Sequence, residues 1–236
     1  MIDDSSTYRE RRTLASAFAL CALATLTLLA NHPSDGGAKT FADFIQSTAQ
    51  SQLADAIVHG GFIVTLAALI ICFVFFCRCL GPMRGRVVIG LVTFCIGCGA
   101  LMASMVVDGF VTPALATRFS DLSHPENLAM AKTLLILCGT LIRFLMPMGL
   151  LFQAAAMLSW SSIVVTGRGL ARAVGVFGLF AALCLVVALF VVPMAMAAQV
   201  VLGGILLQAI WYFALAALLF SHDPAPGAEE SLPREV

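Results

Sequence analysis

The amino-acid sequence predicts an all-α, polytopic membrane helix bundle of about six transmembrane helices, with both chain termini in the cytoplasm. The composition is the first reason, because 61% of the residues are hydrophobic and only 11% are charged. Mean hydropathy is +1.00, far too apolar for a water-soluble domain of this length. The second reason is a series of apolar runs that each reach the roughly 20 residues needed to cross a bilayer. The third is that arginines gather between alternate runs.

The six predicted spans follow from the apolar runs in chain order. They are Leu14–Ala30, Val58–Cys77, Val87–Val107, Leu141–Trp160, Leu170–Val192 and Gln199–Phe220. The first run follows a basic segment and therefore also resembles a cleaved signal peptide. Its length and the lack of a small-residue cleavage site favour a retained helix. We therefore expect a cytoplasmic segment over residues 1–12, a bundle over 13–221 and a disordered cytoplasmic tail over 222–236.

Basic residues near helix ends set the predicted orientation, because lysine and arginine are preferentially retained in the cytoplasm. One side receives most of them: Arg9, Arg11, Arg12, Arg78, Arg84, Arg86, Arg168 and Arg172. The opposite loops carry Lys39, Arg118 and Lys132. The alanine-rich, lysine-poor composition and short cytoplasmic loops favour a bacterial inner membrane.

Two long segments are predicted to project outside, over about residues 32–57 and 109–140. Thr40 with Asp43, and Ser123 with Glu126, each match a capping box, which marks the start of a helix. Helices begun there and continued into the second and fourth spans would reach about 60 Å, so both would extend past the bilayer. Thr112 followed by Pro113 predicts one further short helix. We therefore expect a small helical cap on the extracytoplasmic side.

Ionisable and amide side chains are predicted to meet at one depth beside this cap. Counting about 20 residues outward from the cytoplasmic helix ends brings His59, Asp108, Arg143 and Gln199 to nearly the same level on four helices. Asp55 precedes His59 by four residues, so the two side chains share a helix face. These five residues are the predicted ligand-binding set of an outward-opening cavity.

The chemistry of that layer leaves several interpretations open. An imidazole, carboxylates and a guanidinium can ligate a divalent metal, relay protons or hold an anion. A metal site would use His59 and Asp108, with His124 as a further ligand from the outer loop. The plain alternative is structural pairing, such as an ion pair between Arg143 and Asp108. Met146, Met148, Met194 and Met196 offer thioethers to Cu(I) as a rival site.

Deeper in the spans, Gln153 and Gln208 each need a hydrogen-bonding partner, because hydrocarbon offers none. Interhelical hydrogen bonds are the expectation. Most of the eight cysteines also lie inside apolar runs, where a thiol acts as a small hydrophobe.

The first functional hypothesis is a non-enzymatic membrane protein whose outer cavity binds or passes a small solute or a lipid group. The first alternative is a membrane-embedded, metal-dependent enzyme acting at the extracytoplasmic face, and the second is an accessory subunit that docks another membrane protein. The sequence has no HExxH motif, phosphate-binding loop or nucleophile elbow, and it identifies no cofactor. It also lacks the basic patch of a nucleic-acid-binding protein.

Overall fold

The computed structural model describes residues 4–33, 39–81, 85–121, 124–191 and 197–221, and within these ranges the chain is helical with no strand. In chain order the elements are α1 (Asp4–Ala30), α2 (Phe41–Gln50), α3 (Gln52–Leu80), α4 (Gly85–Val106), the π-helix η1 (Val107–Val111), α5 (Thr112–Arg118), α6 (Pro125–Val164), α7 (Leu170–Val191) and α8 (Ala197–Ser221).

Six of the described helical stretches are long and apolar enough to cross a membrane. They coincide with the six predicted spans, so the chain has the character of a multi-pass membrane protein. Large apolar side chains such as Phe144, Phe180 and Phe190 are more than half exposed on the outside of the bundle. An exposed apolar surface of this kind is expected where lipid, not water, surrounds the helices.

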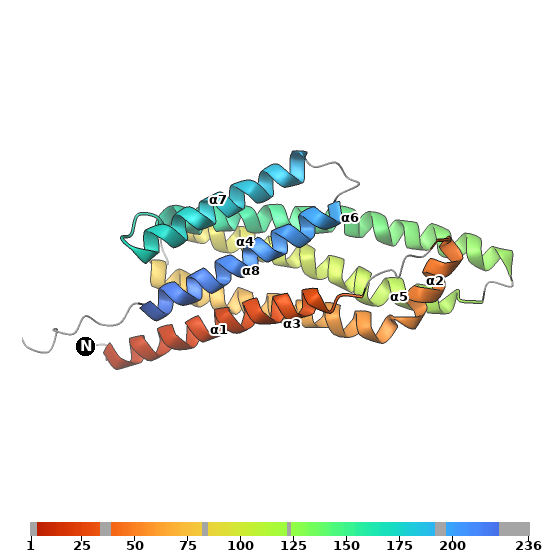
Figure 1. The fold of residues 1–236 in the computed structure, drawn as a ribbon, viewed down its shortest axis with the longest axis horizontal. Helices are drawn as coiled ribbons and strands as arrows, with labels where there is room; N and C mark the ends of the chain where they lie inside the picture. Colours follow the sequence, from red (N-terminus) through yellow and green to blue (C-terminus); the bar gives the residue numbers. More distant parts are fainter. Residues whose placement is uncertain (1–3, 34–38, 82–84, 122–123, 192–196, 222–236) are drawn as a thin grey trace, which may run out of the picture.

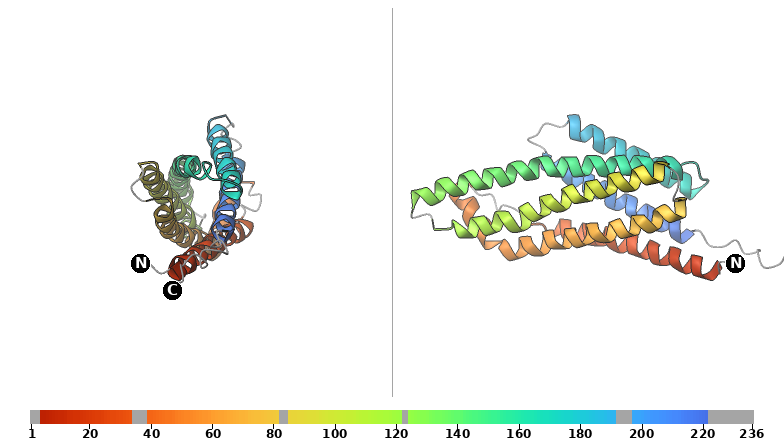
Figure 2. Two further views of the ribbon diagram at one scale, coloured as in Figure 1. Left: turned by 90° about the vertical axis from the view of Figure 1, so that its left-hand side faces the viewer. Right: turned by 180° about the vertical axis from the view of Figure 1, so that it is seen from behind.

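The helices form an elongated bundle whose two ends differ (Figure 1). The start of α1 and the end of α8 lie together at one end. At the other end lie α2, α5 and the first turns of α6, which we call the cap end. Seen along the bundle, the long helices surround a central axis (Figure 2). The most extensive packing is between α4 and α6, α1 and α8, and α6 and α7.

Aromatic side chains form the centre of the bundle core. The Phe73 and Trp160 rings stack with centroids 4.3 Å apart and an interplanar angle of 7°. Phe18 contacts Phe73 edge-on at 4.9 Å. Gly90 makes room for this stack, because a Cβ there would overlap the Trp160 indole. Small residues in α7 also let helix backbones approach, because a Cβ at Gly175 would overlap Val165 and one at Gly178 would overlap Ser161.

A separate small core holds the cap end together. Ile45 of α2, Ala116 of α5, and Ala131 and Leu135 of α6 are buried against one another. The capping box predicted at Thr40 is present: the Asp43 N–H donates to Thr40 Oγ1 at 3.1 Å, and the Thr40 N–H donates to Asp43 Oδ2 at 3.0 Å. Thr40 therefore starts a real helix, as its sequence pattern indicated.

The prediction that this helix runs unbroken into the second span is wrong. Ser51 separates α2 from α3 with φ −85° and ψ 1°, and α2 turns across the cap end (Figure 1). The physical reason is the burial of Ile45: packing α2 against α5 covers its apolar face, whereas a straight extension would leave that face in water. A low-energy bend at one residue is enough to allow this.

The other two cap predictions have mixed outcomes. α6 spans 40 residues and continues through Pro147, so the long fourth element is present. It begins at Pro125 after His124, whereas Ser123, half of the predicted capping box, lies outside the described residues. The short helix at Thr112 also exists as α5, but it follows α4 directly through η1. Thr112 Oγ1 donates to the Val107 carbonyl at 2.9 Å and so supports the wider π turn.

Candidate functional site

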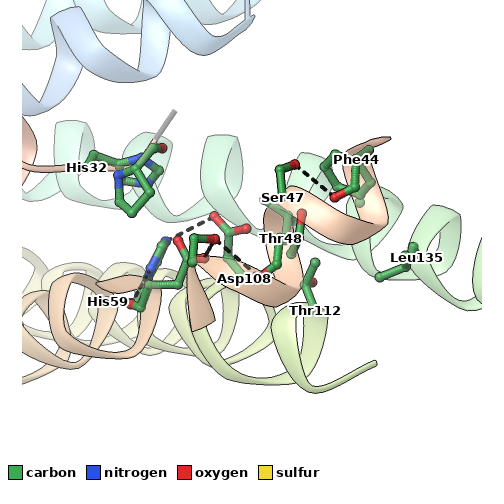
Figure 3. A pocket seen from close by; sticks show the side chains of 13 residues that line it. His32, Phe44, Ser47, Thr48, His59, Asp108, Thr112 and Leu135 are labelled. Atoms are coloured by element: carbon green, nitrogen blue, oxygen red, sulfur yellow. Dashed lines mark hydrogen bonds and ion pairs between the residues drawn. The ribbon is translucent and has the colours of Figure 1, made fainter. Parts of the chain in front are cut away.

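A polar pocket of about 210 Å³ lies where the cap end meets the long helices. His32 and Pro33 line it from the chain just after α1, and α2, α3, η1, α5 and α6 supply the remaining walls. Five separate elements thus converge on one cavity. Figure 3 shows the labelled side chains of His32, His59 and Asp108 close together at one side of it.

His59 is the most deeply buried ionisable residue of the pocket, with a relative exposure of 1%. Its Nδ1 atom lies 2.8 Å from the backbone carbonyl of Asp55, one turn earlier on α3. Because a carbonyl can only accept, Nδ1 carries the proton in this contact. The Nε2 atom then faces Asp108 Oδ2 at 3.2 Å. The α3 backbone therefore fixes both the orientation and the tautomer of this ring.

Asp108 reaches the pocket from η1, where the helix is locally widened. One residue more per turn changes the direction of the side chains that follow, and π-helical turns are often found at functional sites. Gly109, the next residue, packs directly against the His59 side chain, so that a Cβ there would overlap it. η1 thus brings Asp108 to His59 with the backbone itself in close contact.

The third member of the cluster is His32. Its Nδ1 atom lies 2.8 Å from the Pro33 carbonyl, so the proton is again on Nδ1 and Nε2 is left available. The His32 and His59 rings meet edge-on with centroids 5.0 Å apart. One potential ligand atom from each of His32, His59 and Asp108 lies within 4.8 Å of the others. Two imidazoles and one carboxylate are therefore clustered on one side of the pocket.

The His59–Asp108 contact requires a proton or a metal ion between the two side chains. With the proton on Nδ1, a neutral imidazole would point the Nε2 lone pair at a carboxylate oxygen, and two acceptors repel. A proton on Nε2 or on Asp108, or a metal ion, removes that repulsion. Each of these arrangements is compatible with 3.2 Å.

The other charged groups of the pocket favour a cation. Asp55 is buried and its Oδ2 atom accepts a hydrogen bond from Ser51 Oγ at 2.6 Å. Ser47, Thr48 and Thr112 also line the cavity. The lining residues of the described chain include two carboxylates and no lysine or arginine. An anion would therefore find no countercharge here.

The structure brings together only part of the predicted ligand-binding set. Asp55, His59 and Asp108 line the pocket. Arg143 and Gln199 do not line it, and both side chains are exposed. Asp108 makes its ion pair with His59, and the ion pairs of the described residues do not include one between Arg143 and Asp108.

The proposed metal ligand His124 is also elsewhere. It pairs with Glu126 at 3.4 Å at the start of α6, where both side chains are more than half exposed. The histidine that lies beside His59 and Asp108 is His32. A signal for His32 was present in the sequence: it follows the first span within two residues, at the same end as His59. Of the methionines considered for Cu(I), Met194 and Met196 lie outside the described residues.

Comparisons with protein families, with curated proteins and with solved structures found no match to this chain. The chemistry of the pocket is therefore the basis for a functional assignment.

Proposed function

We propose that this integral membrane protein binds a divalent transition-metal ion through His32, His59 and Asp108. The observation that carries the proposal is the shared hydrogen bonding of the two histidines. Each gives its Nδ1 proton to a backbone carbonyl, at 2.8 Å in both cases. Metal-binding histidines characteristically donate their other ring N–H in this way, which orients the ring and frees the ligating nitrogen.

The distances support the same ligand set. Zinc binds histidine nitrogen and carboxylate oxygen at about 2.0–2.2 Å, which in a tetrahedron separates neighbouring ligand atoms by about 3.3 Å. His59 Nε2 and Asp108 Oδ2 already lie 3.2 Å apart. His32 is the exposed member and lies in the chain between α1 and α2, so a small movement of its ring is enough to complete the set. Nitrogen and oxygen donors suit Zn²⁺, Fe²⁺ and related ions better than a softer ion such as Cu(I).

Three protein ligands leave at least one coordination position open toward the pocket. A metal held in this way can exchange a water molecule for a solute, whereas a purely structural zinc site is closed by four protein ligands. The small solute that the outer cavity was expected to bind is, in this proposal, the metal ion itself.

The test is metal binding by the purified full-length chain. After treatment with a chelator, the protein is titrated with Zn²⁺, and Co²⁺ serves as a spectroscopic probe because its visible absorption reports nitrogen and oxygen ligation. We expect equimolar binding that is lost in His59→Ala and weakened at least tenfold in His32→Ala. His124→Ala is the matched control and should bind like the parent, because His124 lies outside the pocket.

Two outcomes would contradict the proposal. If the parent bound no Zn²⁺ after chelation, or if His124→Ala lost as much affinity as His32→Ala, the cluster would be an ordinary imidazolium–carboxylate pair. Thermal unfolding in the presence and absence of Zn²⁺ is a second measurement, because a ligand bound only by the folded state raises Tm.

One feature favours metal-dependent hydrolysis as a second candidate. The buried Asp55 carboxylate lines the same pocket and is oriented by Ser51. A carboxylate beside an open metal position can take the proton of a metal-bound water, as a hydrolase requires. In that case Asp55→Asn would retain equimolar Zn²⁺ and lose turnover of a water-accessible ester. If Asp55→Asn lost the metal instead, Asp55 would be part of the ligand shell and not a base.

A further inference from the structure

A second, inner cavity of about 40 Å³ lies inside the bundle. We call the polar pocket described above the outer pocket. Residues of α1, α3, α4, α6 and α8 line it. A layer of three buried apolar side chains separates the two cavities: Val58, Phe62 and Met105. Phe62 lies one turn from His59 on α3, and Met105 of α4 lies three residues before Asp108 of η1. The two cavities are therefore stacked along the same faces of two helices.

Two of the residues that line this inner cavity carry buried amide atoms without a hydrogen-bonding partner. Gln153 and Gln208 are only 3% and 6% exposed, and both line it. The Gln153 Nε2 donates to Cys98 Sγ at 3.4 Å, but its Oε1 has no partner. The Gln208 Nε2 also has none. One acceptor and one donor without partners thus belong to residues of the same cavity, and each is unfavourable to bury unless a partner is bound there.

Two threonines add acceptors. Thr25 Oγ1 donates to the Cys21 carbonyl and Thr65 Oγ1 donates to the Gly61 carbonyl, each at 2.8 Å. Since each hydroxyl proton is used within its own helix, the oxygen lone pairs remain free toward the cavity. The other lining residues are mostly apolar.

We propose that this inner cavity is a hydration site that holds a small cluster of ordered water molecules within the membrane-spanning bundle. Water is the ligand that satisfies all these groups, because it both donates to Gln153 Oε1 and accepts from Gln208 Nε2. A bound cation could not accept from Gln208. About 10–15 Å³ of such volume is needed for each water, so 40 Å³ accommodates up to about three.

The proposal gives the bundle two hydrated cavities, with the buried side chains of Val58, Phe62 and Met105 between them. We therefore expect water in the inner cavity to exchange more slowly with bulk solvent, and to meet fewer of its solutes, than water in the outer pocket.

X-ray radiolytic footprinting of the full-length protein in lipid nanodiscs tests this directly. Radicals formed from ordered water oxidise the side chains beside it, and mass spectrometry locates the oxidised methionines. Met105 lines the cavity and is 5% exposed, whereas the similarly buried Met157, at 2%, does not line it. We expect Met105 to be oxidised several-fold faster than Met157.

A radical scavenger in the buffer separates internal from bulk water. It should suppress oxidation of Met130, which is 53% exposed on α6, and leave Met105 largely unaffected. Equal rates for Met105 and Met157 would show that the cavity is dry. Suppression of Met105 to the same degree as Met130 would show bulk water instead of an isolated cluster. Either result overturns the proposal, and both are read on the parent protein without any substitution.

A substitution in the inner cavity tests whether the water that leads to Met105 oxidation is bound there. Gln208→Leu removes one of the two orphaned amides and should lower Met105 oxidation toward the Met157 rate, while Zn²⁺ binding in the outer pocket stays unchanged. Gln199→Leu is the matched control, because Gln199 is an exposed glutamine on the same helix. If Gln208→Leu left Met105 oxidation at the parent rate, the water beside Met105 would belong to the outer pocket and the inner site would not exist.

Discussion

His59 owes its position to contacts on three sides. The Asp55 carbonyl holds Nδ1, Asp108 faces Nε2, and Gly109 packs against the base of the side chain. A glycine is required for this approach, because any Cβ at position 109 would overlap the His59 Cβ and Cγ atoms. The His59 Nε2 atom is therefore placed by backbone packing as much as by hydrogen bonds.

Gly109→Ala is expected to weaken Zn²⁺ binding and to lower stability by about 1–3 kcal/mol, the usual cost of forcing an extra methyl group into a packed site. Both effects follow from the displacement of His59 away from Asp108. Isothermal titration with Zn²⁺ and thermal unfolding measure the two effects separately.

Gly99→Ala provides the control for that change. Gly99 is also helical, on α4, and a Cβ there meets no atom within 4 Å. It should bind Zn²⁺ like the parent and be no less stable, since alanine favours the helix over glycine. Parent-like Zn²⁺ affinity in Gly109→Ala would mean that the contact with Gly109 does not position the ring.

Part of the candidate site was predictable from the sequence, because helix rise sets the approximate depth of a residue once the span ends are known. Asp55, His59 and Asp108 line one pocket, whereas Arg143 and Gln199 do not. The direction in which each side chain points depends on rotation of the helix about its axis, which is set by packing. Arg143 is exposed for that reason, whereas His59 is buried. Asp108 further depends on η1, a local widening that has no reliable sequence signature.

Among the secondary-structure elements, α2 forms part of the pocket wall although it is short. It supplies Phe44, Ser47 and Thr48 to the wall, yet it spans only 10 residues. Helices this short are marginal in water unless packing and caps support them. Its support is the buried Ile45 and the reciprocal hydrogen bonds between Thr40 and Asp43.

Thr40→Ala is therefore expected to destabilise α2 by about 1 kcal/mol, the typical cost of losing an N-cap. The readout is hydrogen–deuterium exchange, which should become several-fold faster at the α2 amides and stay unchanged in α3. Thr133→Ala is the control, since that hydroxyl only bonds to the Ala129 carbonyl of its own exposed helix face. Unchanged exchange in α2 would show that packing alone maintains the helix.

The break between α2 and α3 could not be read from the sequence. The capping box at Thr40 correctly marks a helix start, and apolar residues continue into the second span. Nothing at Ser51 forbids a helix, because serine is tolerated in helix interiors. The bend results from tertiary packing of α2 on α5, and such contacts between distant segments are absent from local sequence patterns. The six spans, by contrast, depend only on local hydropathy and were all predictable.

At the scale of the whole molecule, the bundle is polarised along its long axis. The start of α1 and the end of α8 share one end of the bundle with the end of α3, the start of α4 and the end of α6 (Figure 1), and Arg78 and Arg86 belong to the described part of these helix ends. The elements α2 and α5, which line the pocket, lie at the other end (Figure 1). The excess of arginine at the first end predicts that this end is cytoplasmic. A metal would then enter the pocket from the extracytoplasmic side, above the apolar layer of Val58, Phe62 and Met105.

The two lysines of the chain, Lys39 and Lys132, allow this orientation to be tested. Both are exposed and lie at the cap end, in the connection before α2 and on the first turns of α6. A membrane-impermeant, amine-reactive reagent applied to intact cells should therefore label both lysines and leave the N-terminal amine unmodified. Mass spectrometry of the purified protein identifies the labelled sites, and lysed cells show which amines are intrinsically reactive. Labelling of the N-terminal amine alone would show the opposite orientation, with the pocket on the cytoplasmic side. The same side chains would then have to compete with other cytoplasmic proteins for metal ions.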